Sequence, residues 1–488
     1  MKRTLSLSLA AASLIAQPIL AVLVSFGAAL ASTRPRYGGT LRMQMRARVA
    51  SLHPTEFPAD PAQAAATERL ALLVFDRLIA LDEQGRPTPQ LALSWQHDAA
   101  FQRWEFLLRP GVKFHDGAAL TAALVAGFLR SLGENFLVNA SSGMLVIQSS
   151  SPAPDLLLEL ARPRHFIFRS GSEGLLLGTG PFKLAEWQPQ RKAVLTAFEE
   201  HWGGQPYVDA VEIEMGVNHR DQLIALEVGR ADLVEILPGD VRRAAQGGRR
   251  VSSSAPVELM ALLCVPGKPA AENPRIRESL ALSVDRASIH SVLLQRQGEL
   301  AGGLLPQWLS GYAFLFPVAS DAPRARELWS QLAAPPRALR LDYDPADPLA
   351  QSISERIALN AREAGIPLQV AGLAAPSAAA QTDLRLVRVR LKYPGAMQTL
   401  ADIVKLLGLE QPSNSASADQ PEQVYAAERQ LLETGGVIPL FHLPEIVGLS
   451  PRVKNWMPFR WGEWRLADVW LAPEVAAAPP AAKVPEKP

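Results

Sequence analysis

Histidine is the residue type whose spacing we consider first, because histidines at short spacing bind zinc or act as general bases. No two of the eight histidines stand four residues apart, and Cys264 is the only cysteine. The histidines lie singly along the chain, at positions 53, 97, 115, 165, 201, 219, 290 and 442. We therefore expect no metal site, and a single cysteine excludes an internal disulfide.

Signatures of catalysis are equally scarce. The sequence has no Gly-x-Ser-x-Gly motif and no Gly-Lys-Ser or Gly-Lys-Thr that would close a phosphate loop. His115-Asp116-Gly117 could be a base beside its orienting carboxylate, but adjacent residues seldom reach one substrate atom, and we expect a turn. Gly178-Thr179-Gly180 lacks the third glycine of a dinucleotide site. The sequence thus predicts neither an enzyme nor a cofactor.

Basic residues cluster on one predicted strand, 384–391, and just after it. Arg385, Arg388, Arg390 and Lys392 follow one another at short spacing. One interpretation places them on a solvated sheet edge, where basic side chains discourage strand pairing. The other has some of them face a cleft and bind an anionic ligand. Arg388 and Arg390 are our candidates for that role.

Alternating strands and helices must position these residues. Apolar residues recur at period 2 in some segments and at helical spacing in others, with Gly, Pro and Asn at the boundaries. The predicted strands are 40–45, 101–108, 194–198, 208–215, 339–343, 367–371 and 384–391, and the predicted helices are 64–79, 219–228, 275–294, 348–364 and 421–434. This alternation indicates an α/β fold.

The chain termini carry separate signals. Lys2 and Arg3 precede an apolar run that ends at the small-residue site 29–31, which predicts a signal peptide over residues 1–31 and a periplasmic protein. An uncleaved membrane anchor is the alternative, because the run is long enough to span a bilayer. Residues 473–488 are rich in Ala, Pro and Lys, and we expect a disordered tail. The formal net charge of +1 gives no indication of nucleic-acid binding.

Several ordered blocks of the sequence resemble the family-5 extracellular solute-binding proteins, the oligopeptide, dipeptide and nickel receptors of ABC importers. The most specific block runs from Trp104 to Gly117 and reads WEFLLRPGVKFHDG. The other similar blocks are YGGTL at 37–41, LHP at 52–54, VFDRL at 74–78, PQLA at 89–92, GTGPF at 178–182, WGG at 202–204 and RESLALSVDR at 277–286. They span nearly the whole mature chain.

The resemblance implies a two-lobed type II periplasmic-binding-protein fold with an additional outer subdomain in lobe one. We place lobe one at 37–255 plus 443–472, its outer subdomain at about 52–170, and lobe two at 256–442. The implied function is that of a monomeric receptor, which captures a peptide-like or other small polar solute between its lobes and delivers it to an ABC permease in the inner membrane. The alternative is an orphan binding protein acting as a sensor, chaperone or scaffold.

Departures from the family pattern bear on the ligand. Peptide receptors of this family carry an acid that pairs with the peptide amine in a Trp-x-x-Asp-Tyr-Pro-Asp-Pro segment of lobe two. The similar stretch here, 390–396, keeps Tyr393 and Pro394 but neither acid, and Asp402 is a weak substitute. The segment 132–154 looks shorter than its family counterpart.

Aromatic residues supply the remaining candidates. By resemblance, Trp308 and Tyr312 lie in a loop that presents aromatic side chains to the ligand, and with Tyr393 they complete our candidate ligand-binding residues. For Trp456, Trp461 and Trp464 we expect packing roles instead.

Overall fold

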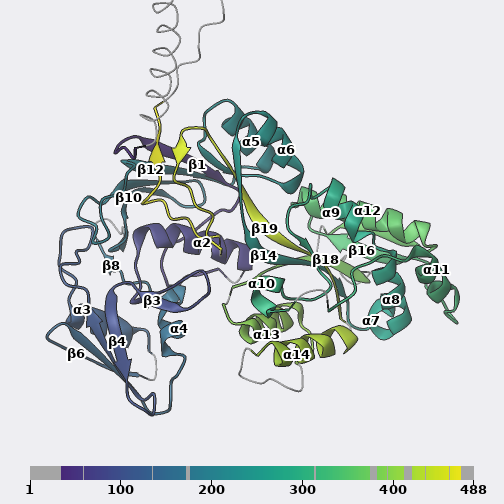
Figure 1. Cartoon of the computed structure of the whole chain (residues 1–488), viewed down its shortest axis with the longest axis horizontal. Helices are drawn as coiled ribbons and strands as arrows, with labels where there is room; N and C mark the ends of the chain where they lie inside the picture. Colours follow the sequence, from purple (N-terminus) through teal and green to yellow (C-terminus); the bar gives the residue numbers. More distant parts are fainter. Residues whose placement is uncertain are drawn as a thin grey trace, which may run out of the picture.

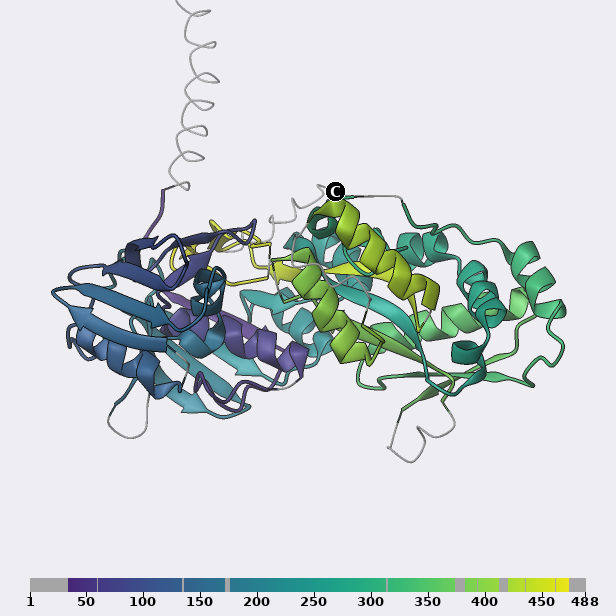
Figure 2. The ribbon, with the colours of Figure 1, turned by 90° about the horizontal axis from the view of Figure 1, so that it is seen from below.

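A computed structural model describes residues 34–58, 60–133, 136–171, 176–312, 315–373, 382–392, 394–411, 420–434, 436–460 and 462–473. Two lobes lie side by side, and the chain returns from the second lobe to the first at its C-terminal end (Figures 1 and 2). The predicted signal peptide lies outside the described residues, as does the tail beyond residue 473. None of the helices among the described residues combines the length and apolarity needed to span a bilayer.

One hydrogen-bonded sheet runs through both lobes. Its strands in the first lobe are β10 (Phe182–Gln188), β11 (Lys192–Ala197), β12 (Ala210–Met215), β1 (Thr40–Met45) and β13 (Leu233–Glu235), in that spatial order. Its next strands are β19 (Val437–Leu449), β14 (Arg250–Cys264), β18 (Leu384–Arg390), β16 (Leu339–Tyr343) and β17 (Leu368–Gly372), with β15 (Glu299–Leu300) paired to β19. The pairs β1–β12 in the first half and β16–β17 at the far edge of the second half are parallel.

The long antiparallel strands β14 and β19 connect the lobes. Their register shifts between Ser253 and Pro256, between Pro256 and Glu258, and once more between Met260 and Ala261. Pro256 stands opposite Pro444 within this irregular stretch. Since proline cannot donate to the ladder, the sheet is weakest here, at the point where it passes from one lobe to the other.

Helices cover the sheet and separate the cores. The first lobe has α2 (Pro61–Val74), α5 (His219–Glu227) and α6 (Val241–Gln246). The second lobe has α7 (Pro269–Glu272), α8 (Pro274–Ser283), α9 (Arg286–Val292), α10 (Gln307–Ser310), α11 (Ala322–Ser330), α12 (Pro348–Glu363), α13 (Ala396–Leu407) and α14 (Pro421–Thr434). Separate buried apolar clusters lie around Leu41 in the first lobe and around Leu341 and Leu400 in the second.

An outer subdomain extends the first lobe. Its four-stranded antiparallel sheet has the order β4 (Ala92–His97), β5 (Arg103–Leu108), β7 (Met144–Ser149) and β6 (Phe136–Ser141). The helices α3 (Ala122–Ser131) and α4 (Leu156–Leu160) and the hairpin β2 (Ile79–Leu81) to β3 (Pro87–Pro89) complete it. A cluster around Phe106 forms its own core.

Most predicted elements are present. The strands 40–45 and 339–343 and the helix 421–434 are confirmed with the same bounds. The predicted helix 275–294 is wrong as one element, because Val284 takes an extended backbone and the Asp285 side chain caps α9 by accepting from the Ser288 N–H at 3.0 Å. The helix predicted to reach residue 79 ends at Val74.

Candidate ligand-binding cleft

Two adjoining cavities lie where the first lobe faces the second. The one that we call the basic cavity has a volume of about 370 Å³, and its first-lobe wall comes from α2, the segment 54–58 and the segment 158–164. Its second-lobe wall comes from Arg390 to Lys392, Pro394 and Gln398. Six basic side chains line it against two acids: Arg69, Arg77, Arg162, Arg164, Arg390 and Lys392 against Glu68 and Glu463.

Three guanidinium groups of the basic cavity are buried, and each has a carboxylate partner. Arg69 pairs with Glu235 at 3.9 Å and also with Glu445, which is shared by Arg390. Burial and the nearby Arg69 charge lower the pKa of Arg390 to about 9, so Arg390 remains charged at neutral pH. These guanidinium groups are therefore held in fixed positions by carboxylates behind them.

Arg77 is held by a different set of contacts. Its guanidinium pairs with Glu68 at 3.3 Å, donates to the Ala161 carbonyl and stands over the Phe166 ring, 5.1 Å from the ring centroid. Its Nε atom is buried without a hydrogen-bond partner, as is the Nε atom of Arg69. Each guanidinium thus retains an unused donor.

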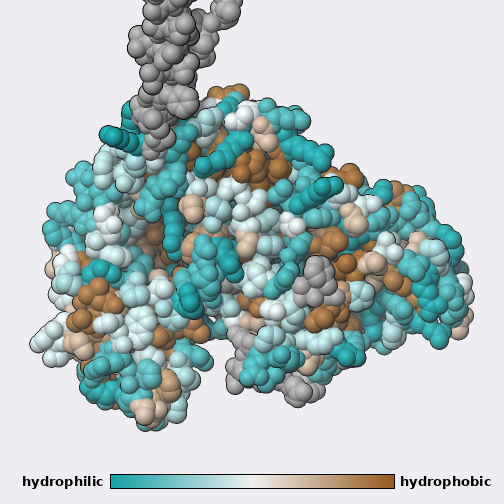
Figure 3. All heavy atoms as spheres, in the orientation of Figure 1, coloured by the Kyte–Doolittle hydropathy of each residue, from teal (hydrophilic) through white to brown (hydrophobic). Residues whose placement is uncertain are grey.

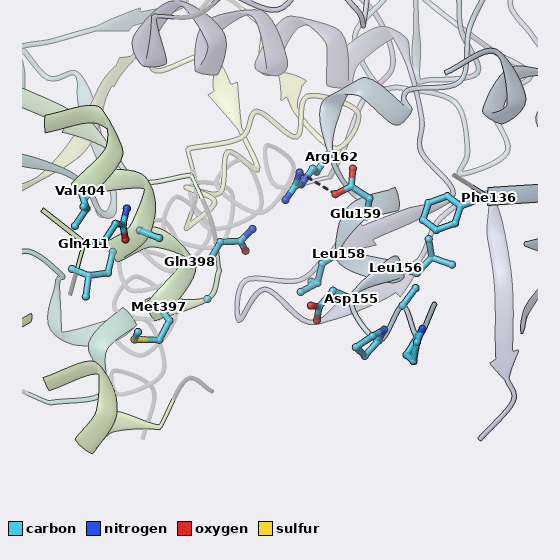
Figure 4. Close-up of a pocket in the computed structure, with 16 residues that line it drawn as sticks. Phe136, Asp155, Leu156, Leu158, Glu159, Arg162, Met397, Gln398, Val404 and Gln411 are labelled. Carbon is cyan, nitrogen blue, oxygen red and sulfur yellow. Dashed lines mark ion pairs between the residues drawn. The ribbon is translucent and has the colours of Figure 1, made fainter. Parts of the chain in front are cut away.

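The second cavity, which we call the apolar cavity, has a volume of about 610 Å³ and lies between the outer subdomain and α13. Figure 4 shows Met397, Gln398 and Val404 on one side, facing Leu156 and Leu158 on the other. In Figure 3 the surface is hollowed between the same two parts of the molecule. Leu158, Arg162 and Gln398 line both cavities, which makes them two compartments of one cleft.

The lobes touch beside this cleft. Gly85, in the turn between β2 and β3, lies against Pro394, and a Cβ atom on Gly85 would stand 1.8 Å from the Pro394 Cβ. Its φ of +75° also favours glycine. Asp82 makes the turn rigid by accepting from the Gln84 and Arg86 N–H groups at 2.9 and 2.8 Å.

The predicted basic strand is not at a sheet edge. β18 lies between β14 and β16, so the solvated-edge interpretation is wrong. Arg388 pairs with Asp347 at 2.7 Å and with Glu258, and it is not among the residues that line the two cavities. Burial alone would lower the pKa of Arg388, but the two carboxylates raise it above its ordinary value. Only Arg390 and Lys392 of the basic cluster reach the cleft.

The predicted aromatic residues are placed elsewhere. Trp308 donates from Nε1 to the Pro256 carbonyl at 2.8 Å, and the Tyr312 hydroxyl donates to Glu428. Neither side chain lines the two cavities, nor does Asp402, and Tyr393 lies outside the described residues. Contact of Arg388, Trp308, Tyr312 and Tyr393 with a ligand therefore stays a prediction.

The sequence of this chain matches the model of a known protein family. The model of the bacterial extracellular solute-binding proteins, family 5, matches residues 86–394. The chain belongs to this family. It is 25% identical over 344 residues to the nickel-binding periplasmic protein of Escherichia coli (strain K12), a match that spans 62% of this chain and 66% of that relative, just under two thirds.

Solved structures show the same fold. NikA from Brucella suis in complex with Fe(III)-EDTA has a TM-score of 0.74 at 20% identity, and the match covers 89% of this chain and all of NikA. The substrate-binding protein CtaP from Listeria monocytogenes has a TM-score of 0.73 at 17% identity, covering 90% of this chain and all of CtaP. The two-lobed α/β fold of family-5 solute-binding proteins is thereby confirmed.

In this family-5 protein, separate signature blocks meet at Asp76. Its carboxylate accepts from Gln90 Nε2 at 2.8 Å, Thr179 Oγ1 at 2.9 Å and Trp202 Nε1 at 2.8 Å. Gly178 is required by close approach, since a Cβ there would stand 1.9 Å from the Val74 carbonyl oxygen. The signature blocks therefore hold the outer subdomain to the end of α2.

The tryptophans near the C-terminus pack as expected. Trp456 and Trp464 are buried in the first-lobe core, while Trp461 lies outside the described residues. Sequence reasoning missed Arg77, Arg162, Met397 and Glu463 as cleft residues. Arg77 stands inside the signature block 74–78, which is the one signal that pointed toward it.

Proposed function

We propose that this family-5 protein is the periplasmic receptor of an ABC importer, which binds a small organic solute in the cleft between its lobes and delivers it to a membrane permease. The observation that carries the proposal is the cleft itself, whose two compartments are lined from both lobes. A solute that touches both walls stabilises the closed form, and a permease can distinguish that form from the open one.

The lobe boundaries in this proposal are 37–255 plus 443–472 for lobe one, with the outer subdomain at about 52–170, and 256–442 for lobe two. They are supported by the irregular register at Pro256 and Pro444, where the connecting strands have fewest regular ladder bonds. We infer that the hinge lies there. The cleft walls then belong to opposite lobes, as closure requires.

An organic solute fits the cleft walls, which offer guanidinium groups and apolar side chains. Among the described residues, no three His, Cys, Asp or Glu side chains are placed to hold a metal ion. The proposed cycle is binding, closure and release. It requires no catalytic step, and we propose no enzymatic activity.

The proposed receptor is exported and acts as a monomer. Cleavage after Ala31 would release a monomeric mature chain into the periplasm. Mass spectrometry of the periplasmic fraction should find an N-terminus at Ser32, and light scattering should give one chain per particle. A chain that retains residues 1–31 in the membrane fraction would support the anchored alternative.

The test of the receptor function is a thermal-shift screen of the mature protein against peptides, organic anions, sugars and metal chelates. A solute at about 100 times its dissociation constant adds about 2.7 kcal/mol of stability. Small-angle scattering should then show a smaller radius of gyration with the bound solute. A solute that is chemically converted, or the absence of any stabilising solute, would contradict the proposal.

A further inference from the structure

We propose that the solute is an amphipathic organic anion, whose carboxylate or phosphate head occupies the basic cavity and whose hydrocarbon body occupies the apolar cavity. This inference rests on the proposed function, because it names the chemical class that the same cleft would receive. It is carried by the arrangement of charge and apolar surface along the cleft.

The head-group argument starts from the wall of the basic cavity. Arg69, Arg77 and Arg390 are 7%, 4% and 8% exposed, so each guanidinium is more than nine-tenths buried at the cavity. The carboxylates of Glu235 and Glu445, which pair with Arg69, are not among the lining residues. The cations therefore line the cavity, whereas these carboxylate partners do not.

Within the part of the chain that the structure describes, two guanidinium groups at this wall each have one hydrogen-bond donor without a partner. The Nε atoms of Arg69 and Arg77 are buried, and neither has a hydrogen-bond partner among the described residues. A buried donor without a partner leaves the charge of its guanidinium less compensated, which makes this wall of the cavity favourable for an anion. Lys392 adds an exposed ammonium to the same wall.

The two acids that line the basic cavity offset only part of this charge. Glu68 is paired with Arg77. Burial raises the pKa of the Glu463 carboxyl, and the nearby Arg77 charge offsets part of that effect. Six basic side chains line the same cavity, so basic groups remain in excess at this wall.

The apolar cavity indicates what kind of body the ligand carries beside its charged head. The apolar cavity is lined mainly by carbon side chains, among them Phe136, Leu156, Met397, Leu400 and Val404. It adjoins the basic cavity, since Leu158, Arg162 and Gln398 line both. Its volume of about 610 Å³ is within the range of about 300–1,000 Å³ that holds a drug-sized ligand. A ligand with only a charged head would leave this apolar surface in water.

Isothermal titration calorimetry of the mature protein tests this class with octanoate and octyl phosphate as probes. Both should bind, and octylamine and octanol should bind at least about tenfold more weakly. Between butanoate and octanoate the dissociation constant should fall about fourfold for each added methylene. The tighter of the two octyl anions identifies the head group, and either order supports the inference.

Matched variants locate the two ends of the ligand. Lys392→Gln should weaken octanoate binding about tenfold, whereas Lys405→Gln, at an exposed lysine that lines neither cavity, should leave it unchanged. Ala401→Gln places a polar side chain in the apolar cavity and should reduce the gain per methylene, while Leu406→Gln on the same helix should not. Circular dichroism confirms that each variant is folded.

The outcomes separate this inference from the receptor function. Equal binding of octylamine and octanoate, or a dissociation constant that does not change with chain length, overturns the amphipathic anion. If free-amine peptides bind and no octyl anion binds, the amphipathic-anion proposal is overturned, but the proposed receptor function still holds. If no solute of any class binds, both proposals fail.

Discussion

His115 is a buried histidine whose hydrogen bonds determine its protonation. Nδ1 accepts from the Gly178 N–H at 3.2 Å, and Nε2 lies 3.0 Å from the Gly180 carbonyl oxygen, which only a protonated Nε2 can satisfy. Burial lowers the pKa of His115 from 6.5 to about 4, and Lys183 contributes in the same direction. The ring is therefore neutral and holds the turn at residues 115–117, a turn that the sequence predicted.

This neutral ring predicts an acid-sensitive stability. Since the folded-state pKa lies below the unfolded value, protons favour the unfolded chain, so the stabilising contribution is complete above about pH 6.5 and is lost as the pH falls to about 4. The loss should reach about 3 kcal/mol. Urea unfolding of the wild-type protein and of His115→Gln across this range measures it. Parallel curves for the two proteins would show that His115 does not carry the effect.

Arg388 tests whether a predicted ligand residue is instead structural. Arg388→Ala would leave the 5%-exposed Asp347 without this cation, and because Arg388 itself is exposed we expect a loss of about 1–2 kcal/mol in unfolding free energy. Lys405→Ala, at an exposed helix position, is the control and should change stability by less than about 0.5 kcal/mol. Solute affinity measured on Arg388→Ala adds a second result, since a large loss of affinity in the folded variant would place Arg388 in the ligand site.

Among the elements, the hairpin turn at Gly85 sets how far the lobes close. Gly85→Ala should clash with Pro394 and hold the cleft open, because the turn is fixed by Asp82 and cannot retreat. A penalty of about 1.4 kcal/mol on the closed form weakens solute binding about tenfold. Small-angle scattering of the solute-bound variant should show a larger radius of gyration than the wild type.

Gly111 provides the matched control for this substitution. Its φ of +73° resembles that of Gly85, but a Cβ there would meet nothing within 4 Å. Both alanine variants should therefore lose about 1–2 kcal/mol from backbone strain, and only Gly85→Ala should lose affinity. An equal loss of affinity in both would trace the effect to strain in the outer subdomain and not to the lobe contact.

The elements that the sequence predicted well are those with a local cause. The helix 421–434 begins at Pro421 and keeps a regular apolar period, and β16 alternates within a short run. β14 and β19 were not predicted because neither alternates between a buried and an exposed face: β19 is buried on both faces over most of its length, and most of the first half of β14 is half-buried. The residues that line the cleft could not be predicted for a related reason. Glu68 and Arg390 are far apart in the sequence, and the fold brings them to one cavity only through the connecting strands.

At the scale of the whole molecule, an ionic network joins segments from both lobes. Glu445 of β19 pairs with Arg69 of α2 and with Arg390 of β18, and Arg69 also lies 3.9 Å from Glu235. Glu445 follows directly after Pro444, where the connecting strands are irregular. One carboxylate thus holds two buried guanidinium groups together at the junction of the lobes, and like charges would otherwise repel there.

Removing that carboxylate should therefore affect stability and lobe arrangement together. Glu445→Gln removes the carboxylate that Arg69 and Arg390 share, while Arg69 keeps Glu235 at 3.9 Å, and we expect a loss of about 3 kcal/mol, with a larger radius of gyration in solution. The double variant Glu445→Gln with Arg390→Gln should recover part of both losses, because only one guanidinium then remains. Glu433→Gln, which breaks only an exposed pair with Arg429, is the control and should change neither quantity. If Glu445→Gln lowers stability but leaves the radius of gyration unchanged, the network is a local stabiliser and does not hold the lobes together.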